Sequence, residues 1–427
     1  MNNMPIKQIK LKNGLPVFLI KLPAHKTVTV LVMFKTGSKY EDRKTSGLSH
    51  FLEHMFFKGT NKRPDALILS SELDAMGADY NAFTSKEYTG YYIKSTKDKI
   101  EVSLDILSDM LLNSKFDSQE IEKEKGVIIE ELNMYEDNPR IKIEDVFESC
   151  LYGDTPAGWD TIGNKETIRN FKRSDFIKYF SNQYGVKSMA VFVAGNFSDK
   201  EIKKMLAKNF SLFKKNNYRD KLKVVEKQIK PNLLIKNKKT DQTVLSLGFR
   251  AFSANHPDEH ILKLLAVILG GSMSSRLFTE IRERRGLAYF IRSSIETYTD
   301  SGYIDSQAGV PNNKLKEAVQ AILNCHQELK NNLVGKEELQ KAKDLVSGKT
   351  IVQMEGSDDF SSWYAHQFIK NRKKFLSPEE SLNKIKKVTA KDIKRVAQKV
   401  FINKNLNLAI IGNVKNKEVV KNILKID

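Results

Sequence analysis

The chain has 427 residues, of which 40% are hydrophobic and 9% aromatic, so it is long enough for two domains and is not of the disordered class. The formal net charge is +19, but the lysines are spread along the whole length and often flank acidic residues, which favours a solvated surface over a nucleic-acid-binding face. The two cysteines, Cys150 and Cys325, are far apart in sequence, which excludes a disulfide framework and suits a reducing compartment.

The sequence shows no recognisable targeting or membrane signal. Residues 1–16 contain lysines but no apolar core of a signal peptide. The longest apolar run, at 262–269, is far too short to cross a bilayer and contains Lys263. We therefore expect a cytoplasmic protein with no membrane span and no nucleic-acid partner.

From the N-terminus onward, the sequence predicts the same series of strands and helices twice. Strands are predicted at 16–20 and 29–34 and again at 233–235 and 243–249, and a helix follows in both copies. Each copy closes with a strand, a Gly-Asn pair and a lysine-rich amphipathic helix, with the closing strands predicted at 190–196 and 408–413. A repeat of this length predicts a duplicated domain and not a solenoid.

Strands mixed with long helices predict an α+β fold. We expect two homologous α/β-sandwich domains, each a mostly antiparallel sheet with helices packed on one face. The domains are placed at 1–213 and 231–427. The segment between them, 214–230, is charged and lacks apolar periodicity, as a linker does.

The first copy contains a motif for metal chemistry. Residues 47–57 are predicted to be helical, and His50 and His54, four residues apart, then lie on one face at the spacing that two imidazole ligands of a zinc ion need. Glu53 lies beside them, where a carboxylate can take a proton from metal-activated water. This H-x-x-E-H order is the inverzincin signature. A catalytic zinc needs a third protein ligand, and manganese or cobalt would suit similar donors.

A second H-x-x-E-H, at 256–260, is not expected to bind metal, although Glu337 follows it at a suitable distance. Pro257, with Asn255 as a candidate cap, predicts that a helix begins there, so His256 would lie at its fraying end. In the register of the repeat, the second copy also has apolar and glycine residues where the first copy has its motif. The first motif is therefore the predicted metal site.

Together with this motif, three further segments resemble the insulinase/pitrilysin family (M16) of zinc peptidases. They are the acidic segment 124–134, the glycine-rich loop at 269–278 and the segment 282–289. The resemblance covers nearly the whole chain and is closest to the short, two-domain members similar to bacterial processing peptidases. It implies a Zn²⁺ cofactor.

The resemblance implies the full set of metal residues. In the family a glutamate ligand follows H-x-x-E-H after about 76 residues, and 76 residues separate His54 from Glu131. His50, His54 and Glu131 are thus the implied zinc ligands, and Glu53 is the implied general base. Glu130 is the rival for the third ligand, and the residues that follow fit the family register better with Glu131.

Further residues take their roles from the resemblance alone. Glu124, two helical turns before the third ligand, would support a metal ligand from behind. Arg282 and Tyr289, seven residues apart, would hydrogen-bond the substrate carbonyl or the oxyanion that develops on hydration. The β-rich segment 79–92 would add an extended peptide to a sheet edge, through Asn81, Ala82 and Phe83.

The implied activity is that of a zinc metalloendopeptidase acting on unfolded peptides, oligopeptides or presequences. Because larger relatives carry four such units in one chain, we expect this two-unit chain to be a homodimer. The alternative is a non-catalytic scaffold or partner subunit, since the family includes members without the metal site. The complete set of metal and substrate residues favours the enzyme. A basic nucleic-acid-binding protein would instead show salt-sensitive binding in a gel shift.

Overall fold

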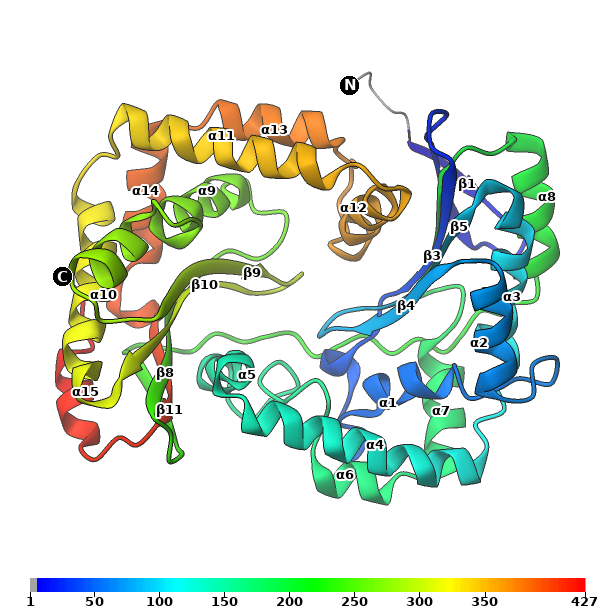
Figure 1. Cartoon of the computed structure of the whole chain (residues 1–427), viewed down its shortest axis with the longest axis horizontal. Helices are drawn as coiled ribbons and strands as arrows, with labels where there is room; N and C mark the ends of the chain where they lie inside the picture. Colours follow the sequence, from blue (N-terminus) through cyan, green and yellow to red (C-terminus); the bar gives the residue numbers. More distant parts are fainter. Residues whose placement is uncertain (1–5, 427) are drawn as a thin grey trace. The chain divides into compact units, whose positions relative to one another are not determined.

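The computed structural model describes residues 6–426, which form two compact units (Figure 1). Within the described residues, unit 1 contains 6–133, 159–222 and 352–378, and unit 2 contains 134–158, 223–351 and 379–426. The first five residues and Asp427, which the predicted domains include, lie outside the described part. The start of residues 1–16, for which no signal peptide is predicted, lies outside it as well.

Unit 1 is built on a six-stranded sheet. Its strands are β1 Ile6–Lys10, β2 Pro16–Lys21, β3 Thr27–Phe34, β4 Asp79–Thr84, β5 Thr89–Thr96 and β6 Met189–Gly195. Its helices are η1 Ser38–Tyr40, α1 Leu48–Met55, α2 Ala66–Ala75, η2 Lys97–Lys99, α3 Ile100–Asn113, α4 Ser118–Asp137, α6 Lys165–Asn170, α7 Arg173–Gln183, α8 Asp199–Phe210 and α12 Ser357–Ile369, with the last residues of α4 belonging to unit 2.

Unit 2 is built on a five-stranded sheet. Its strands are β7 Asn232–Asn237, β8 Gln242–Arg250, β9 Phe290–Thr297, β10 Gly302–Pro311 and β11 Leu406–Gly412. Its helices are α5 Pro139–Tyr152, α9 Glu259–Gly270, η3 Phe278–Arg284, η4 Asn312–Lys314, α10 Leu315–Asn331, α11 Lys336–Gln353, α13 Pro378–Lys386, α14 Ala390–Val400, η5 Asn403–Asn405 and α15 Lys417–Ile423, with the end of α11 and the first residue of α13 belonging to unit 1.

The two sheets share one topology. Their strand orders are β1-β2-β6-β3-β5-β4 and β7-β11-β8-β10-β9. Each contains one parallel pair, β2 with β6 and β7 with β11, and the remaining neighbours are antiparallel. Apart from the additional β1, the sheets therefore match strand for strand. The predicted α+β fold, with a duplicated and mostly antiparallel sheet, is confirmed.

Helices cover both faces of each sheet, whereas the sequence predicted helices on one face only. In unit 1, Leu31 and Met33 of β3 pack with Phe360 and Tyr364 of α12, which comes from the C-terminal half of the chain (Figure 1). The alternate residues of β3 point to the opposite face, where α3 contacts the strand. Burial on both faces explains why these strands read as continuous apolar runs. In β6 all seven residues are buried.

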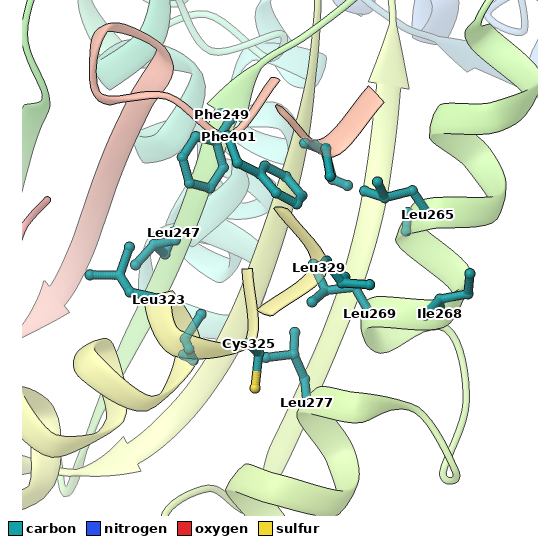
Figure 2. Packing of buried hydrophobic residues seen from close by; sticks show 14 of the residues in the cluster. Leu247, Phe249, Leu265, Ile268, Leu269, Leu277, Leu323, Cys325, Leu329 and Phe401 are labelled. Atoms are coloured by element: carbon teal, nitrogen blue, oxygen red, sulfur yellow. The ribbon is translucent and has the colours of Figure 1, made fainter. Parts of the chain in front are cut away.

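Unit 2 repeats this arrangement. Leucines of α9 and α10 belong to the same buried cluster as Leu247 and Phe249 of β8 (Figure 2). The opposite face, with Val244 of β8, packs with Ile143 and Phe147 of α5, a helix from the N-terminal half. Each unit thus differs from the predicted domains 1–213 and 231–427 by a segment from the other half of the chain, 352–378 in unit 1 and 134–158 in unit 2. The physical reason is that an apolar sheet face is stabilised by any helix that buries it.

The segment expected to be a linker, 214–230, contains neither helix nor strand. Among residues 6–426, no helix combines the length and apolar character needed to cross a bilayer.

Candidate metal centre

The H-x-x-E-H motif lies on α1 in unit 1, as the sequence predicted for 47–57. The helix is attached to the unit 1 core by one apolar face, formed by Leu48, Phe51, Leu52 and Met55. His50, Glu53 and His54 fall outside this face and stay partly exposed. The spacing of apolar residues therefore fixes the side of the helix on which the motif is presented.

The structure brings His50, His54 and Glu131 together. The imidazole rings of the two histidines lie with their centroids 4.8 Å apart. His50 Nε2 lies 3.6 Å from Glu131 Oε1, and His54 Nε2 lies 3.5 Å from Glu131 Oε2. Donor atoms of a tetrahedral zinc ion, bonded at about 2.0–2.2 Å, are separated by roughly 3.3 Å. In residues 6–426, no other three His, Cys, Asp or Glu side chains gather closely enough to hold a metal ion.

Glu130, the rival third ligand, points elsewhere. It is exposed, and its Oε1 accepts a hydrogen bond from Asn133 Nδ2 at 3.3 Å. Both glutamates lie on α4, where consecutive residues are rotated by about 100° around the axis. The geometry therefore brings Glu131, and not Glu130, to the histidines.

Glu124 lies behind His54, as expected from its position on α4. His54 Nδ1 donates to Glu124 Oε1 at 2.9 Å, which leaves Nε2, on the Glu131 side, as the basic nitrogen. Lys58 Nζ lies 2.6 Å from the second oxygen of Glu124. Lys58 was not among the predicted site residues, because it lies in the turn after α1 and beyond the predicted helix 47–57.

The charges of the site suit a cation. Burial lowers the pKa of His54, but hydrogen bonds and charge interactions with Glu124 and Glu131 outweigh it and raise that pKa to about 9. For the carboxyl group of Glu124 burial acts in the opposite direction and raises the pKa, but the hydrogen bonds from His54 and Lys58 bring this pKa below its usual value. Two carboxylates that attract a proton to an imidazole also attract a metal ion, and two imidazoles with one carboxylate form a zinc donor set.

Two buried atoms of the motif are without a hydrogen-bond partner among the described residues, namely His50 Nδ1 and Glu53 Oε2. Buried polar atoms are nearly always satisfied, so such exceptions gather at functional sites. The free oxygen of Glu53 lies on the same helix as both histidines. The side chains present thus fit a zinc ion with a carboxylate beside it.

The segment 79–92 forms β4 and β5. β4 is at the sheet edge and pairs with β5 alone among the described strands (Figure 1). It contacts α1, and the rings of Tyr80 and Phe57 are 6.5 Å apart. Asn81 is exposed, Ala82 is buried and Phe83 is half-buried. An edge strand next to the motif helix can accept another strand by main-chain pairing.

Arg282 and Tyr289 lie together in unit 2. Arg282 belongs to the π-helical segment η3, a geometry frequent at functional sites. Its guanidinium lies 4.8 Å from the ring centroid of Phe278 and 5.8 Å from that of Tyr289. Tyr289 is 69% exposed, so it is not a core residue, and its hydroxyl is accessible at the surface of this unit.

The second H-x-x-E-H has a different geometry. His256 precedes α9, which begins at Glu259. Its ring stacks on Phe252 with the centroids 3.8 Å apart, and its Nδ1 accepts from the backbone N–H of Asp258 at 3.1 Å. His256 and His260 therefore do not share one helical face.

Comparisons with known proteins show which family this chain resembles over most of its length. Residues 16–165 match the model of the insulinase family (peptidase family M16), and residues 170–346 match that of the peptidase M16 inactive domain. The chain is 34% identical over 397 residues to an uncharacterized zinc protease of Bacillus subtilis, covering 93% of this chain and 96% of that protein. It is 35% identical over 414 residues to an uncharacterized zinc protease of Rickettsia felis, covering 94% and 96%.

Solved structures share the fold. A protease from Helicobacter pylori superimposes with a TM-score of 0.89 at 24% identity, covering 96% of this chain and 99% of the other. A peptidase M16 inactive domain from Pseudomonas fluorescens superimposes with a TM-score of 0.88 at 18% identity, covering 96% and 98%. Because M16 family models match both halves of the chain, and zinc proteases at 34–35% identity align over nearly all of it, this protein belongs to peptidase family M16, the insulinase family.

Proposed function

We propose that this chain is a zinc metalloendopeptidase that cleaves unfolded peptides. Membership of a peptidase family whose relatives are named zinc proteases supports the class of reaction. The observation that carries the proposal is the convergence of His50, His54 and Glu131, with Glu53 beside them on α1.

Each side chain has a role in this proposal. His50, His54 and Glu131 hold the zinc ion, and Glu124 accepts the Nδ1–H of His54 to keep its ring oriented. When bound, the ion supplies Lewis acidity toward water and the scissile carbonyl. Glu53 takes a proton from the attacking water on its carboxylate and delivers it to the leaving amine.

Substrate binding in the proposal relies on β4. An extended peptide pairs with the main chain at Asn81, Ala82 and Phe83, a mode that reads little side-chain identity. Oligopeptides and presequences are therefore suitable substrates. Arg282 and Tyr289 donate hydrogen bonds to the substrate carbonyl or to the developing oxyanion. The homodimer and the cytoplasmic location expected from the sequence stay predictions.

The test combines metal content with cleavage of an unstructured peptide by the purified protein. We expect about one zinc per wild-type chain. Glu53→Gln should keep the zinc and lose hydrolysis by about 100-fold or more, the usual loss for a missing general base. Glu122→Gln, at an exposed position on α4, is the matched control and should match wild type. Wild-type turnover by zinc-loaded Glu53→Gln would overturn the mechanism, and a wild type without zinc or activity would overturn the function.

A further inference from the structure

The first turn of α1 has no cap of its own. Its N-cap residue, Gly47, has φ 93° and offers no side chain. A Cβ at this position would lie 2.5 Å from Ile162 O and 2.9 Å from Gly163 Cα, so the backbone approach and the positive φ both require glycine. The N–H groups that open a helix need acceptors. For α1 these must come from elsewhere in the chain.

Glu41 supplies the acceptors. Its Oε2 accepts from Gly47 N at 2.8 Å, and its Oε1 accepts from Ser49 N at 2.7 Å. The Glu41 side chain is only 4% exposed. A second contact fixes the same turn, since the Ser49 hydroxyl lies 2.8 Å from the hydroxyl of Tyr179 on α7. The turn that immediately precedes His50 is thus held from outside the helix.

The carboxylate of Glu41 is kept in a costly environment. Burial raises its pKa to about 7, against the lowering effect of the hydrogen bonds from Ser49 and Gly47 and the charge of Lys86. A negative charge at a helix N-terminus gains from the helix dipole. The two N–H bonds replace the water that the buried oxygens lose. Because each carboxylate oxygen is bonded to a backbone N–H of this turn, the side chain holds the start of the helix in place.

We propose that Glu41 is a positioning residue of the metal centre, whose carboxylate fixes the first turn of α1 and thereby places His50. This inference rests on the proposed function. His50 follows Ser49 directly, so any shift of that turn moves the imidazole. Small displacements of positioned groups are costly, and residues that orient metal ligands typically contribute 10- to 100-fold to metal affinity or activity.

The experiment compares Glu41→Gln with Asp65→Asn. Both substitutions remove one negative charge and keep one acceptor oxygen. Asp65 caps α2 in the same unit, accepting from Ile68 N at 2.9 Å, and has no assigned role at the site. Zinc affinity is measured by competition with a chelator at pH 8 and at a temperature where circular dichroism shows both variants folded. Peptide hydrolysis is then measured at saturating zinc, and hydrogen exchange of α1 amides is followed in parallel.

We expect Glu41→Gln to bind zinc about tenfold or more weakly than wild type. Its kcat should fall with KM little changed, because β4 is untouched, and the α1 amides should exchange faster. Asp65→Asn should change none of these. Glu41→Asp, which retains the charge but is one methylene shorter, should show a zinc affinity between those of wild type and Glu41→Gln. It also tests the positioning role of Glu41 if Glu41→Gln does not fold.

The two hypotheses fail in different ways. A wild-type chain that binds zinc, with folded Glu41→Gln or Glu41→Asp binding it equally tightly, would overturn the positioning role alone. A wild-type chain that binds no zinc would overturn the proposed function together with the positioning role.

Discussion

The contact between Lys58 and Glu124 gives a sharp prediction about the metal centre. Lys58 Nζ lies 2.6 Å from one Glu124 oxygen, and His54 Nδ1 donates to the other. The Glu124 side chain is only 6% exposed. In Lys58→Met this nearly buried carboxylate keeps His54 as its partner and loses the lysine. Leaving a buried polar group partly unsatisfied costs about 1–3 kcal/mol.

This cost should fall mainly on the zinc-bound state. When zinc is bound, His54 must present Nε2 to the ion with its Nδ1–H on Glu124, so a carboxylate that has lost Lys58 orients this ligand less firmly. At 1.4 kcal/mol per tenfold, the expected loss of zinc affinity is about 10- to 100-fold. The assay is chelator competition followed by zinc titration of peptide hydrolysis. Activity should return at high zinc, because the base Glu53 is intact.

The matched control is Lys123→Met. It makes the same change of charge on α4, but Lys123 is 68% exposed and pairs with Glu120 within the same helix. Pairs of this kind contribute little, so zinc affinity should stay at the wild-type value. Equal zinc affinities of folded Lys58→Met and Lys123→Met would refute the orienting role assigned to the Lys58–Glu124 contact.

Three further predictions test the metal residues, the fold and the assembly. His54→Ala should lose bound zinc and His260→Ala should keep it, as read by metal analysis; the reverse result would move the site to the second motif. Burial lowers the pKa of His326 to about 4, so its contribution to the stability of unit 2 is present above about pH 6.5 and lost as the pH falls toward 4. The loss should reach about 2 kcal/mol by pH 5. His326→Phe should abolish this dependence of stability on pH, which is measured as the hydrogen-exchange protection of α10 amides corrected for intrinsic rates. An unchanged pH dependence in the variant would contradict this reasoning. If a homodimer combines the metal residues of one subunit with Arg282 and Tyr289 of the other, mixing inactive Glu53→Gln and Tyr289→Phe chains should partly restore hydrolysis, and failure despite demonstrated subunit exchange would rule this out.

Features that depend on neighbours in sequence could be predicted from the sequence. The helix predicted at 47–57 is α1, and the strands predicted at the opening and close of each copy lie near their observed bounds, whereas β1, β9 and β10 were not predicted. The common strand order of the two sheets agrees with the duplication seen in the sequence. The proximity of His50 and His54 also followed, because helical geometry alone places residues four apart on one side. Glu124 and Glu131 were selected by resemblance to a family, and the supporting role of Glu124 and the ligand role of Glu131 stay predictions.

Features that depend on packing were decided by the tertiary structure. Apolar runs such as 190–196 show that a strand is buried on both faces, but they do not show which helix covers each face. Only the structure assigns α12 to one sheet and α5 to the other. The same holds for Glu41, whose acceptor role arises because Gly47 provides no cap. Periodicity and spacing fix contacts within one element, whereas contacts between distant segments depend on how side-chain volumes pack together, and that is settled only when the whole chain folds.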